Sequence, residues 1–568
     1  MLIQEKTTSG EDKTLKISLN WRKSKLILFG GITLVLVLYV FVNSLNISPF
    51  YMEGATFWCA AFTAYVLAGV FLHYGTIFAQ RVAPAEEEHG PYRVVPRLQL
   101  PKWAIWMVAV PWGFLIIMNI ISSPLVSFPA YRDQLGTPEQ RTFTSDVQVM
   151  DITKLPVVDQ DLAGKLADKK LGERPSLGSQ VYLGEPTIQQ VNGELVWVVP
   201  LQHSGFFKWL TNMEGTPGYI VVSATNPNDV EYVEDYLIKY QPDSYLMHDL
   251  ARYTRFTGAL FQGIVDYSFE LDDNGTPHWV ITTYRNRRGF ALPEATGAII
   301  MDAGSGEHRH YSIEELPEWV DRVQPEIFVM NQINNQGEYV HGILNFANKD
   351  KFQTSEGEMI IYNNGRCYLF TGLTSVGRDE SAISFMMVDM VTKESIRYQI
   401  SGATEWSAQK SAEGKVQNLR YEASFPLILN VEGVPSYFMT LKDAEGLIKQ
   451  YAFVSVENYS IVGTGESIAE AETDYLQALR AGGTDISVNE NLLETKSGVV
   501  ERIASEYTGG ETVYRLTLQG SAGVVYELPA SVSDSLALTQ PGDRVELKFA
   551  QNDTGTMLCS GFENKNLR

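Results

Sequence analysis

The residues best suited to metal chemistry are His308 and His310, which stand two positions apart in the chain. On a strand, side chains two positions apart point to the same face, and Glu307 and Asp302 are close by in the sequence. Two imidazoles and a carboxylate are ligands that zinc accepts. We favour the alternative, an ordinary polar strand face, because no further histidine stands beside the pair. The sequence therefore predicts no metal site, with these histidines as the only candidates.

Two further clusters have the composition of contact sites for partner proteins. The first is aromatic and consists of Phe206, Phe207 and Trp209. The second is rich in arginine and consists of Arg285, Arg287, Arg288 and Phe290. Exposed aromatic residues and arginines are enriched at the centres of protein interfaces. The alternatives are that the aromatic cluster covers its own core and that the arginines are solvated or paired with local acids.

Composition argues against several classes of function. The chain of 568 residues has a formal net charge of −22, so we expect it not to bind nucleic acid. No G-x-S-x-G, H-E-x-x-H, C-x-x-C or P-loop pattern occurs. Of the three cysteines, we expect Cys367 and Cys559 to be isolated thiols, with a disulfide between them as the alternative. We expect a protein that is not an enzyme and needs no cofactor.

Three long apolar runs, Leu26–Val42, Phe57–Ala79 and Trp103–Ile121, occupy the N-terminal part of the chain. A helix needs about 20 apolar residues to cross a bilayer. We therefore predict a cytoplasmic tail at 1–25 and an anchor of three transmembrane helices at 26–122. The alternative is that these runs are buried helices of a soluble core.

Basic residues near the helix ends predict the orientation, because they favour the cytoplasmic side. The tail carries six of them, the 43–55 loop none and the 80–102 loop four. After the third run the first basic residue is Arg132. The N-terminus is therefore expected in the cytoplasm, and residues after about 122 outside it. These outer residues hold 35 basic and 60 acidic side chains, a net charge of −25.

After a linker at 123–150, one pattern of apolar strand, turn and aromatic strand occurs four times. The turns are Asn192-Gly193, Asn274-Gly275, Asn364-Gly365 and Glu432-Gly433. Asn-Gly between apolar runs is a strong signal for a β-hairpin, because both turn residues adopt positive φ. We predict an α+β fold of four small repeats, each an antiparallel sheet with a helix, at 151–242, 243–325, 326–415 and 416–485.

Helices are expected between these sheets. Asp159–Leu171 places leucines near one face, and Tyr245–Phe261 is expected to form one aromatic-rich helix. Ser312 and Ser467 each precede a glutamate by three residues, which is the pattern of a capping box. The second box is expected to open a helix that runs through Leu479.

Motifs in residues 150–482 resemble one known family. A helix with spaced Leu162, Ala163, Leu166 and Ala167 is followed by Glu194-Leu-Val-Trp-Val and Gly218-Tyr-Ile-Val-Val. The second repeat has Pro277-His-Trp-Val and Ile300-Met-Asp-Ala-Gly-Ser-Gly-Glu307. These segments resemble PepSY modules, although the first repeat departs from the family at its turn, which is Asn226-Pro-Asn. The resemblance implies non-catalytic, extracytoplasmic modules attached to membranes or peptidase precursors, and it transfers no site residue.

The last segment, 495–568, has a different pattern. Five short apolar runs read as strands, with a helical stretch at 529–538 between the third and the fourth. Five strands with one helical insert predict a small OB-like β-barrel, with an SH3-like barrel as the alternative.

Together these features predict a non-catalytic, membrane-anchored, extracytoplasmic scaffold of an envelope assembly. Repeated modules provide an extended surface on which several weak contacts add up. The expected partners are the lipid bilayer, other envelope proteins and a second copy of the chain. One alternative is a regulator or chaperone of a secreted peptidase, by analogy with PepSY modules. Another is a metal-dependent enzyme that uses His308 and His310.

Overall fold

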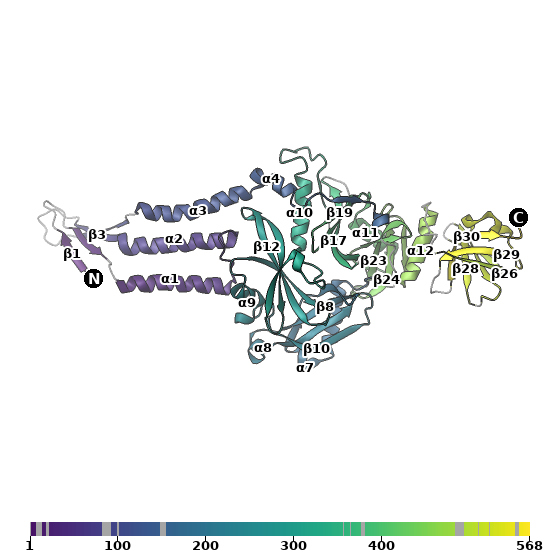
Figure 1. Ribbon diagram of the computed structural model, residues 1–568, viewed down its shortest axis with the longest axis horizontal. Helices are drawn as coiled ribbons and strands as arrows, with labels where there is room; N and C mark the ends of the chain where they lie inside the picture. The colour runs from purple at the N-terminus through teal and green to yellow at the C-terminus, as the bar shows by residue number, and fades with distance from the viewer. Residues whose placement is uncertain are drawn as a thin grey trace.

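Three N-terminal helices extend side by side from a body of sheets, and a small domain lies at the opposite end (Figure 1). The computed structural model describes residues 2–6, 14–18, 22–81, 92–98, 101–147, 155–355, 357–363, 365–376, 381–482, 493–508, 511–521, 523–550 and 556–567. The three helices are α1 (Arg22–Val42), α2 (Met52–Tyr74) and α3 (Lys102–Ser122). At their far end, a four-stranded sheet joins the predicted tail to the predicted 80–102 loop. Its strands are β1 (Leu2–Lys6), β2 (Thr14–Ser18), β3 (Gly75–Arg81) and β4 (Tyr92–Leu98).

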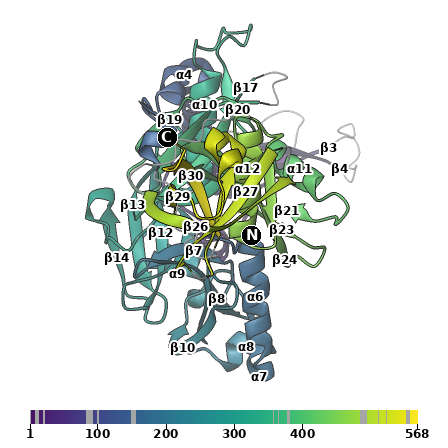
Figure 2. The same cartoon turned by 90° about the vertical axis from the view of Figure 1, so that its right-hand side faces the viewer.

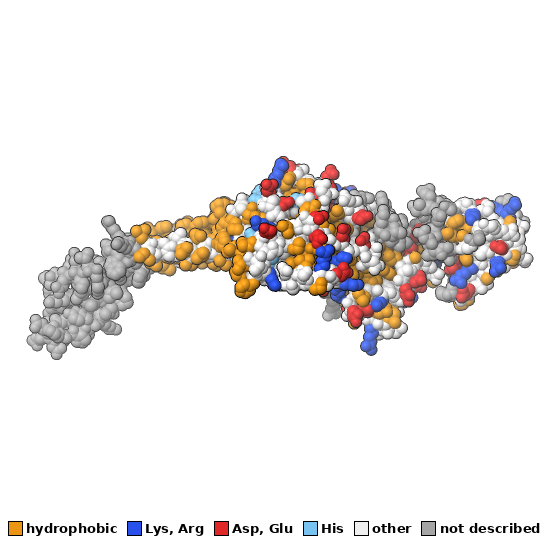
Figure 3. All heavy atoms as spheres, turned by 90° about the horizontal axis from the view of Figure 1, so that it is seen from below, with side chains coloured by type: hydrophobic (Ala, Val, Ile, Leu, Met, Phe, Trp, Pro, Cys, Tyr) orange, Lys and Arg blue, Asp and Glu red, His pale blue; other side chains and the backbone are white. Residues whose placement is uncertain are grey.

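Of the three helices predicted to span a membrane, one is a candidate span in the described residues. Among the described residues, only α3 is long and apolar enough to cross a membrane, judged by length and composition. In α1 the apolar stretch is the shorter Leu26–Val42, because the first turn is basic. Helix α2 begins with Glu53 near its start and ends at Tyr74, where β3 follows, instead of continuing to Ala79. Figure 3 shows apolar side chains covering the visible face of the described helical part.

The predicted linker at 123–150 is built into the body. It forms α4 (Pro124–Arg132), β5 (Glu139–Arg141) and α5 (Phe143–Asp146). Strand β5 pairs in parallel with β19 (Ser395–Tyr398), and Phe143 is buried against the Tyr398 ring. The Tyr398 hydroxyl also donates a hydrogen bond to Asp146. The segment after α3 therefore attaches to the third sheet of the body and not to the first.

The first two sheets each follow a helix, as an α+β repeat requires. The first helix is α6 (Gln160–Gly172), capped by Asp159, and the short α7 (Pro175–Gly178) follows it. Sheet I contains β6 (Val181–Leu183), β7 (Thr187–Val191), β8 (Glu194–His203), β9 (Thr216–Ser223) and β10 (Val230–Ile238), with α8 (Phe206–Thr211) between β8 and β9. Before sheet II, the helix predicted at 245–261 is divided into η2 (Leu246–His248) and α9 (Leu250–Thr257). Sheet II has the order β11 (Gly263–Leu271), β12 (Pro277–Arg288), β13 (Ala291–Asp302) and β14 (His308–Ser312), and η3 (Ile313–Glu315) follows.

The next two sheets repeat this arrangement. Helix α10 (Glu326–Glu338) precedes sheet III, which contains β15 (Phe352–Thr354), β16 (Met359–Asn363), β17 (Arg366–Ser375), β18 (Ser381–Asp389), β19 and β20 (Gly402–Ala403), with β5 at its edge. Helix α11 (Glu405–Lys415) precedes sheet IV, which contains β21 (Glu422–Ala423), β22 (Leu427–Val431), β23 (Val434–Lys442), β24 (Ile448–Ser455) and β25 (Val462–Gly465). Helix α12 (Ile468–Ala481) starts at its predicted Ser467 cap.

Shared hydrophobic cores hold the sheets together in pairs. Sheets I and II bury one core between them, to which Val198, Trp279 and Ile299 contribute. Sheets III and IV share another core with α11. A third core joins α6 and sheet I to sheet IV and α12. In Figure 2, β14 of sheet II and β24 of sheet IV lie on opposite sides of the body. The four sheets therefore meet around a common centre.

The C-terminal strands pair in a ring. They are β26 (Leu493–Thr508), β27 (Glu511–Leu518), β28 (Val525–Pro529), β29 (Arg544–Ala550) and β30 (Thr556–Asn564), with η5 (Ala530–Val532) and η6 (Asp534–Leu538) between β28 and β29. The pairing order is β26-β27-β28-β30-β29, and β29 pairs back onto β26. Cys367 in β17 and Cys559 in β30 are buried free thiols, as is Cys59.

A candidate binding cavity at the junction of the sheets

The two predicted contact clusters lie on different sheets and do not meet. In α8, Trp209 is buried and its indole N–H donates to His248 Nδ1 at 2.9 Å. Phe206 and Phe207 on the same helix are exposed. Trp209 is therefore part of the protein's own core, whereas Phe206 and Phe207 are exposed.

The arginine-rich cluster lies on the β12–β13 hairpin, against the C-terminal end of helix α3. The backbone N–H of Phe290 donates to the Ser122 hydroxyl, at 2.6 Å, in the last turn of α3. Gly289 has a φ of 56°, and a Cβ there would lie 2.4 Å from the Met118 carbonyl oxygen. Arg287 pairs with Glu294 at 3.2 Å, whereas Arg285 and Arg288 make no ion pair within the described residues. The hairpin tip thus contacts the chain's own helix α3.

His308 and His310 lie on edge strand β14, with ring centroids 6.3 Å apart. Both Nε2 atoms face Gly258 at the end of α9. His308 Nδ1 lies 3.1 Å from the Gly306 carbonyl oxygen, and burial, together with His308, lowers the pKa of His310. Among the described residues, no group of three or more His, Cys, Asp or Glu is placed to hold a metal ion.

A cavity of 1640 Å³, which we call the junction cavity, lies where the sheets converge. Its apolar lining includes Trp197, Trp279 and Phe425. Eight acidic residues also line it, namely Asp159, Glu185, Glu194, Asp229, Asp243, Asp266, Glu326 and Glu358. In the part of the chain that the structure describes, Arg322 is the one basic residue of this lining. A site with this lining favours a cationic ligand that also carries apolar groups.

A loop at 316–324, which we call the covering loop, packs across sheet II and contributes Arg322 to the lining of the cavity. Its Val323 carbonyl accepts from the Thr282 hydroxyl of sheet II at 2.9 Å. Its Val323 N–H donates to the Met390 carbonyl beside sheet III at 2.8 Å. The loop therefore bonds to two sheets at once.

Asp321 of the covering loop joins three sheets. Its Oδ2 accepts from the Gln190 N–H of sheet I at 2.7 Å and from the Tyr362 hydroxyl of sheet III at 3.1 Å. Burial raises the pKa of Asp321 to about 6, although both hydrogen bonds favour the carboxylate. A single carboxyl group on the loop over sheet II thus bonds to sheets I and III.

Glu270 lies beneath the same loop, on β11. It is fully buried, and neither side-chain oxygen has a hydrogen-bond partner within the described residues. Burial, reinforced by the Asp321 carboxyl, raises the pKa of Glu270 from 4.5 to about 8, against the lowering effect of Arg322. Near neutral pH Glu270 therefore retains a proton inside the junction.

Arg322 and Glu326 form the polar floor where the acidic side chains converge. Arg322 Nη1 pairs with Glu326 Oε1 at 3.2 Å. Burial raises the pKa of Glu326, Arg322 lowers it, and the carboxylates of Asp266, Glu358 and Glu185 raise it again. One guanidinium is thus shared among several carboxylates, which leaves excess negative charge for a ligand to neutralise.

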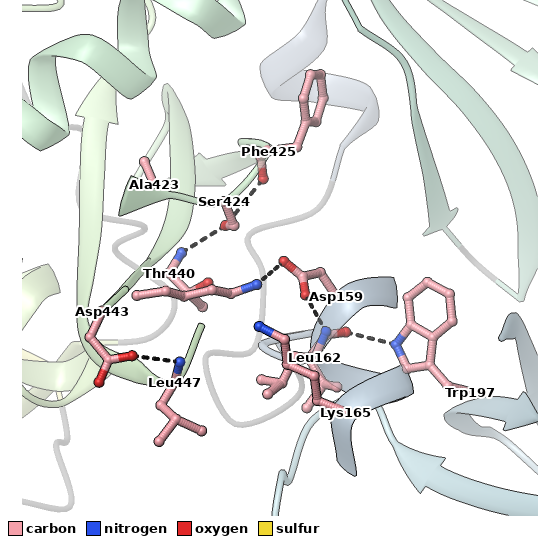
Figure 4. A network of polar contacts seen from close by, with 12 residues as sticks. Asp159, Leu162, Lys165, Trp197, Ala423, Ser424, Phe425, Thr440, Asp443 and Leu447 are labelled. Atoms are coloured by element: carbon pink, nitrogen blue, oxygen red, sulfur yellow. Dashed lines mark hydrogen bonds and ion pairs between the residues drawn. The ribbon is translucent and has the colours of Figure 1, made fainter. Parts of the chain in front are cut away.

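The opposite rim of the cavity is fastened by a polar network between the first and the fourth sheet units (Figure 4). Asp159 caps α6 by accepting from the Leu162 N–H at 3.0 Å, and it also pairs with Lys442 of β23. Trp197 donates to the Val158 carbonyl at 2.7 Å. Thr440 lines the cavity nearby, is 3% exposed, and its hydroxyl has no partner among the described residues.

No motif in the sequence pointed directly to this site. Glu270 alternates with Phe269 on a strand, so its expected position is the solvent face. Asp321 and Arg322 stand in a loop without a motif. The covering loop brings Asp321 and Arg322 close to Glu270 through tertiary packing, which the local sequence does not indicate. Because carboxylates are abundant throughout the chain, the sequence also did not single out the few that lie close together in the cavity.

Comparisons with known proteins do not assign the chain to a family. No family model matches the chain, and no curated protein matches it. Among solved structures, a levansucrase mutant from B. megaterium aligns at 7% identity, over 72% of this chain and 96% of that chain, with a TM-score of 0.18. Such a TM-score carries no argument about fold or function. The resemblance to PepSY modules therefore depends on the motifs quoted above.

Proposed function

We propose that this protein is a membrane-anchored, extracytoplasmic scaffold that holds a partner of the cell envelope in the junction cavity. The observation that carries the proposal is the cavity of 1640 Å³ lined by eight acidic residues and one arginine among the described residues. Its occupant is an extended basic segment of a partner protein, whose apolar side chains contact Trp197 and Phe425. Such a segment neutralises the excess charge around Glu326.

The proposal includes an anchor of three helices with the N-terminus in the cytoplasm. The distribution of basic residues and the apolar surface of the helical part support it (Figure 3). A tag fused after Arg568 should be labelled in intact cells. Labelling only after lysis would overturn this orientation.

We also propose that residues 495–568 form an OB-like module. The pairing order β26-β27-β28-β30-β29 and the position of η5 and η6 support it. Arg515 pairs with Glu506 at 2.7 Å and with Glu527 at 3.1 Å, so this arginine is engaged by acids. The module serves protein contacts in this scaffold.

Peptide binding to the full chain in detergent tests the proposal. We expect a short peptide of alternating lysine and leucine to bind, and the matched peptide of glutamate and leucine not to bind. The double variant Glu326→Gln, Glu358→Gln should weaken binding about tenfold, because two partly exposed carboxylates each contribute up to about 1 kcal/mol. The control variant Glu307→Gln, Glu314→Gln changes two exposed acids outside the cavity lining. Equal binding of both peptides, or equal loss in both variants, would contradict the cavity as the site.

A further inference from the structure

A second cavity, which we call the anchor-side pocket, has the opposite charge. It measures 630 Å³ and lies between the α1–α2 loop, α9 and the β12–β13 hairpin. It is lined by Tyr51, Arg255, Phe256, Phe261, Tyr284 and Arg285, among other residues. No acidic residue belongs to its lining in the described part of the chain.

Arg255 forms the inner wall of the anchor-side pocket and is only 6% exposed. Its Nε donates to the Ser44 carbonyl at 3.1 Å, and its Nη1 donates to the carbonyls of Ala259 at 2.7 Å and Gln262 at 2.5 Å. Within the described residues no carboxylate forms an ion pair with it, although Glu53 is close enough to raise its pKa against the lowering effect of burial. Carbonyl dipoles hold this buried cation in place but leave its net charge uncompensated.

Arg285 forms the outer wall and is exposed. Its cross-strand neighbour on β13 is Glu294. That carboxylate is engaged by Arg287 at 3.2 Å and by Lys393, which leaves Arg285 without an acidic partner among the described residues. Two guanidinium groups without carboxylate partners therefore line one pocket of a strongly acidic protein.

The pocket lies beside the ends of the apolar helices. The Phe256 ring packs on Phe41 of α1 at 5.6 Å, and Tyr51 before α2 donates to the Tyr284 carbonyl at 2.7 Å. At the rim, Phe256 is 38% and Phe261 61% exposed. Figure 1 shows α9 next to the ends of α1 and α2. A cationic pocket with an aromatic rim at this level matches the phosphate and the glycerol region of a lipid.

We propose that the anchor-side pocket binds the headgroup phosphate of an anionic phospholipid. The inference rests on the membrane placement in the proposed function but not on the junction cavity. Arg255 and Arg285 contact the phosphate, and Phe256 and Phe261 contact the adjoining apolar part of the lipid. An anionic lipid is preferred over a zwitterionic one, because a headgroup amine would be repelled by the two arginines.

Native mass spectrometry of the full chain in a non-ionic detergent tests this proposal. The protein is titrated with dioleoylphosphatidylglycerol or with dioleoylphosphatidylcholine, and retained lipids are counted. We expect preferential retention of the glycerol lipid and a decrease of about fivefold in Arg285→Gln, since one arginine near anionic lipid has about that effect. Arg309→Gln, an exposed arginine on β14 of the same sheet, is the matched control and should leave retention unchanged.

Three results would overturn the proposal. The first is equal retention of the two lipids, and the second is unchanged retention in Arg285→Gln. The third is competition by soluble glycerol phosphate at the concentration of the lipid, which would assign the pocket to a soluble ligand. Extraction of the protein by alkaline carbonate without detergent would contradict the membrane placement itself. Peptide binding at the junction cavity is measured in a separate experiment, so a lack of peptide binding does not affect the interpretation of lipid retention.

Discussion

The junction cavity and the anchor-side pocket both include residues of sheet II but have opposite charge. The junction cavity contains one arginine, Arg322, among eight acids, whereas the anchor-side pocket contains Arg255 and Arg285 and no acid in the described lining. Residues 123–568 as a whole have a net charge of −25. Net charge therefore describes solubility here, while the local arrangement of residues determines what each cavity accepts.

The two cavities also differ in how their buried charges are satisfied. In the junction, Asp321 accepts two hydrogen bonds and Glu270 keeps a proton, so charge is removed by protonation and by bonding between sheets. In the anchor-side pocket, Arg255 cannot lose its proton and is held by backbone carbonyls. Because of this difference, we expect the stability of the junction to depend on pH and that of the anchor-side pocket not to.

The largest effect is expected from Arg255→Met. It removes the three hydrogen bonds that Arg255 donates to the carbonyls of Ser44, Ala259 and Gln262 and should cost about 4 kcal/mol of unfolding free energy. Denaturant unfolding of the full chain measures the loss, and hydrogen exchange at Ile47 should rise because its N–H bonds to Leu260 beside this site. Arg309→Met is the control and should stay within about 0.5 kcal/mol. A loss below about 1 kcal/mol would mean that Arg255 does not fasten the loop.

The next effect is the dependence of stability on pH that Glu270 causes. Because the pKa of Glu270 is raised from 4.5 to about 8, the folded state binds an extra proton between these values. Its stabilising contribution is complete below pH 4.5 and is lost progressively as the pH rises to 8, and the part lost between pH 6 and pH 8 is about 3 kcal/mol. Glu270→Gln removes this titration, so its stability should exceed that of the natural chain at pH 9 and vary less with pH.

Thermal unfolding between pH 5 and pH 9 measures the Glu270 effect. Asp321, whose pKa is raised to about 6, contributes in the same direction and keeps part of the slope in the variant. Glu307→Gln, at an exposed position of sheet II, should reproduce the natural profile. Parallel profiles of Glu270→Gln and the natural chain would show that Glu270 is ionised throughout.

A smaller effect is expected from Asp321→Ala. The Gln190 N–H would lose its acceptor and the Tyr362 hydroxyl would keep only the Ile188 carbonyl, at a cost of about 2 kcal/mol. Asp321→Asn keeps an acceptor oxygen and should cost less. Hydrogen exchange of the Gln190 amide distinguishes the two variants. If both variants exchange at the natural rate, Asp321 does not join sheets I and III.

The sequence predicted what neighbouring residues determine. Asn192-Gly193 and Glu432-Gly433 adopt positive φ at their hairpins, as expected from the turn residues. In Asn274-Gly275 only the glycine does so, and Asn364 lies outside the described residues. Asp159 and Ser467 cap α6 and α12. In each case the decisive contacts lie within a few residues, so local chemistry alone fixes the structure.

The sequence did not predict what distant residues determine. One local boundary was also missed: the helix expected at 245–261 is shorter because Asp249 caps a new helix by accepting from the Arg252 N–H, and Leu246 before it has a φ of 50°. The 123–150 segment packs on sheet III, more than 200 residues further along the chain. Arg285 was predicted as a contact residue from its type, but its lack of an acidic partner depends on Arg287 and Lys393 competing for Glu294.

The smallest effect is expected from Phe207→Ala. Phe207 is 77% exposed on α8 and lines neither the junction cavity nor the anchor-side pocket, so its removal should change unfolding free energy by less than about 0.5 kcal/mol. Peptide binding and lipid retention should both equal those of the natural chain. Trp209→Ala, which empties a buried position on the same helix, is the contrast and should destabilise sheet I. If Phe207→Ala instead lowers the capture of a partner while both cavities still bind their ligands, a third surface acts in the scaffold, and the contrast between two cavities is incomplete.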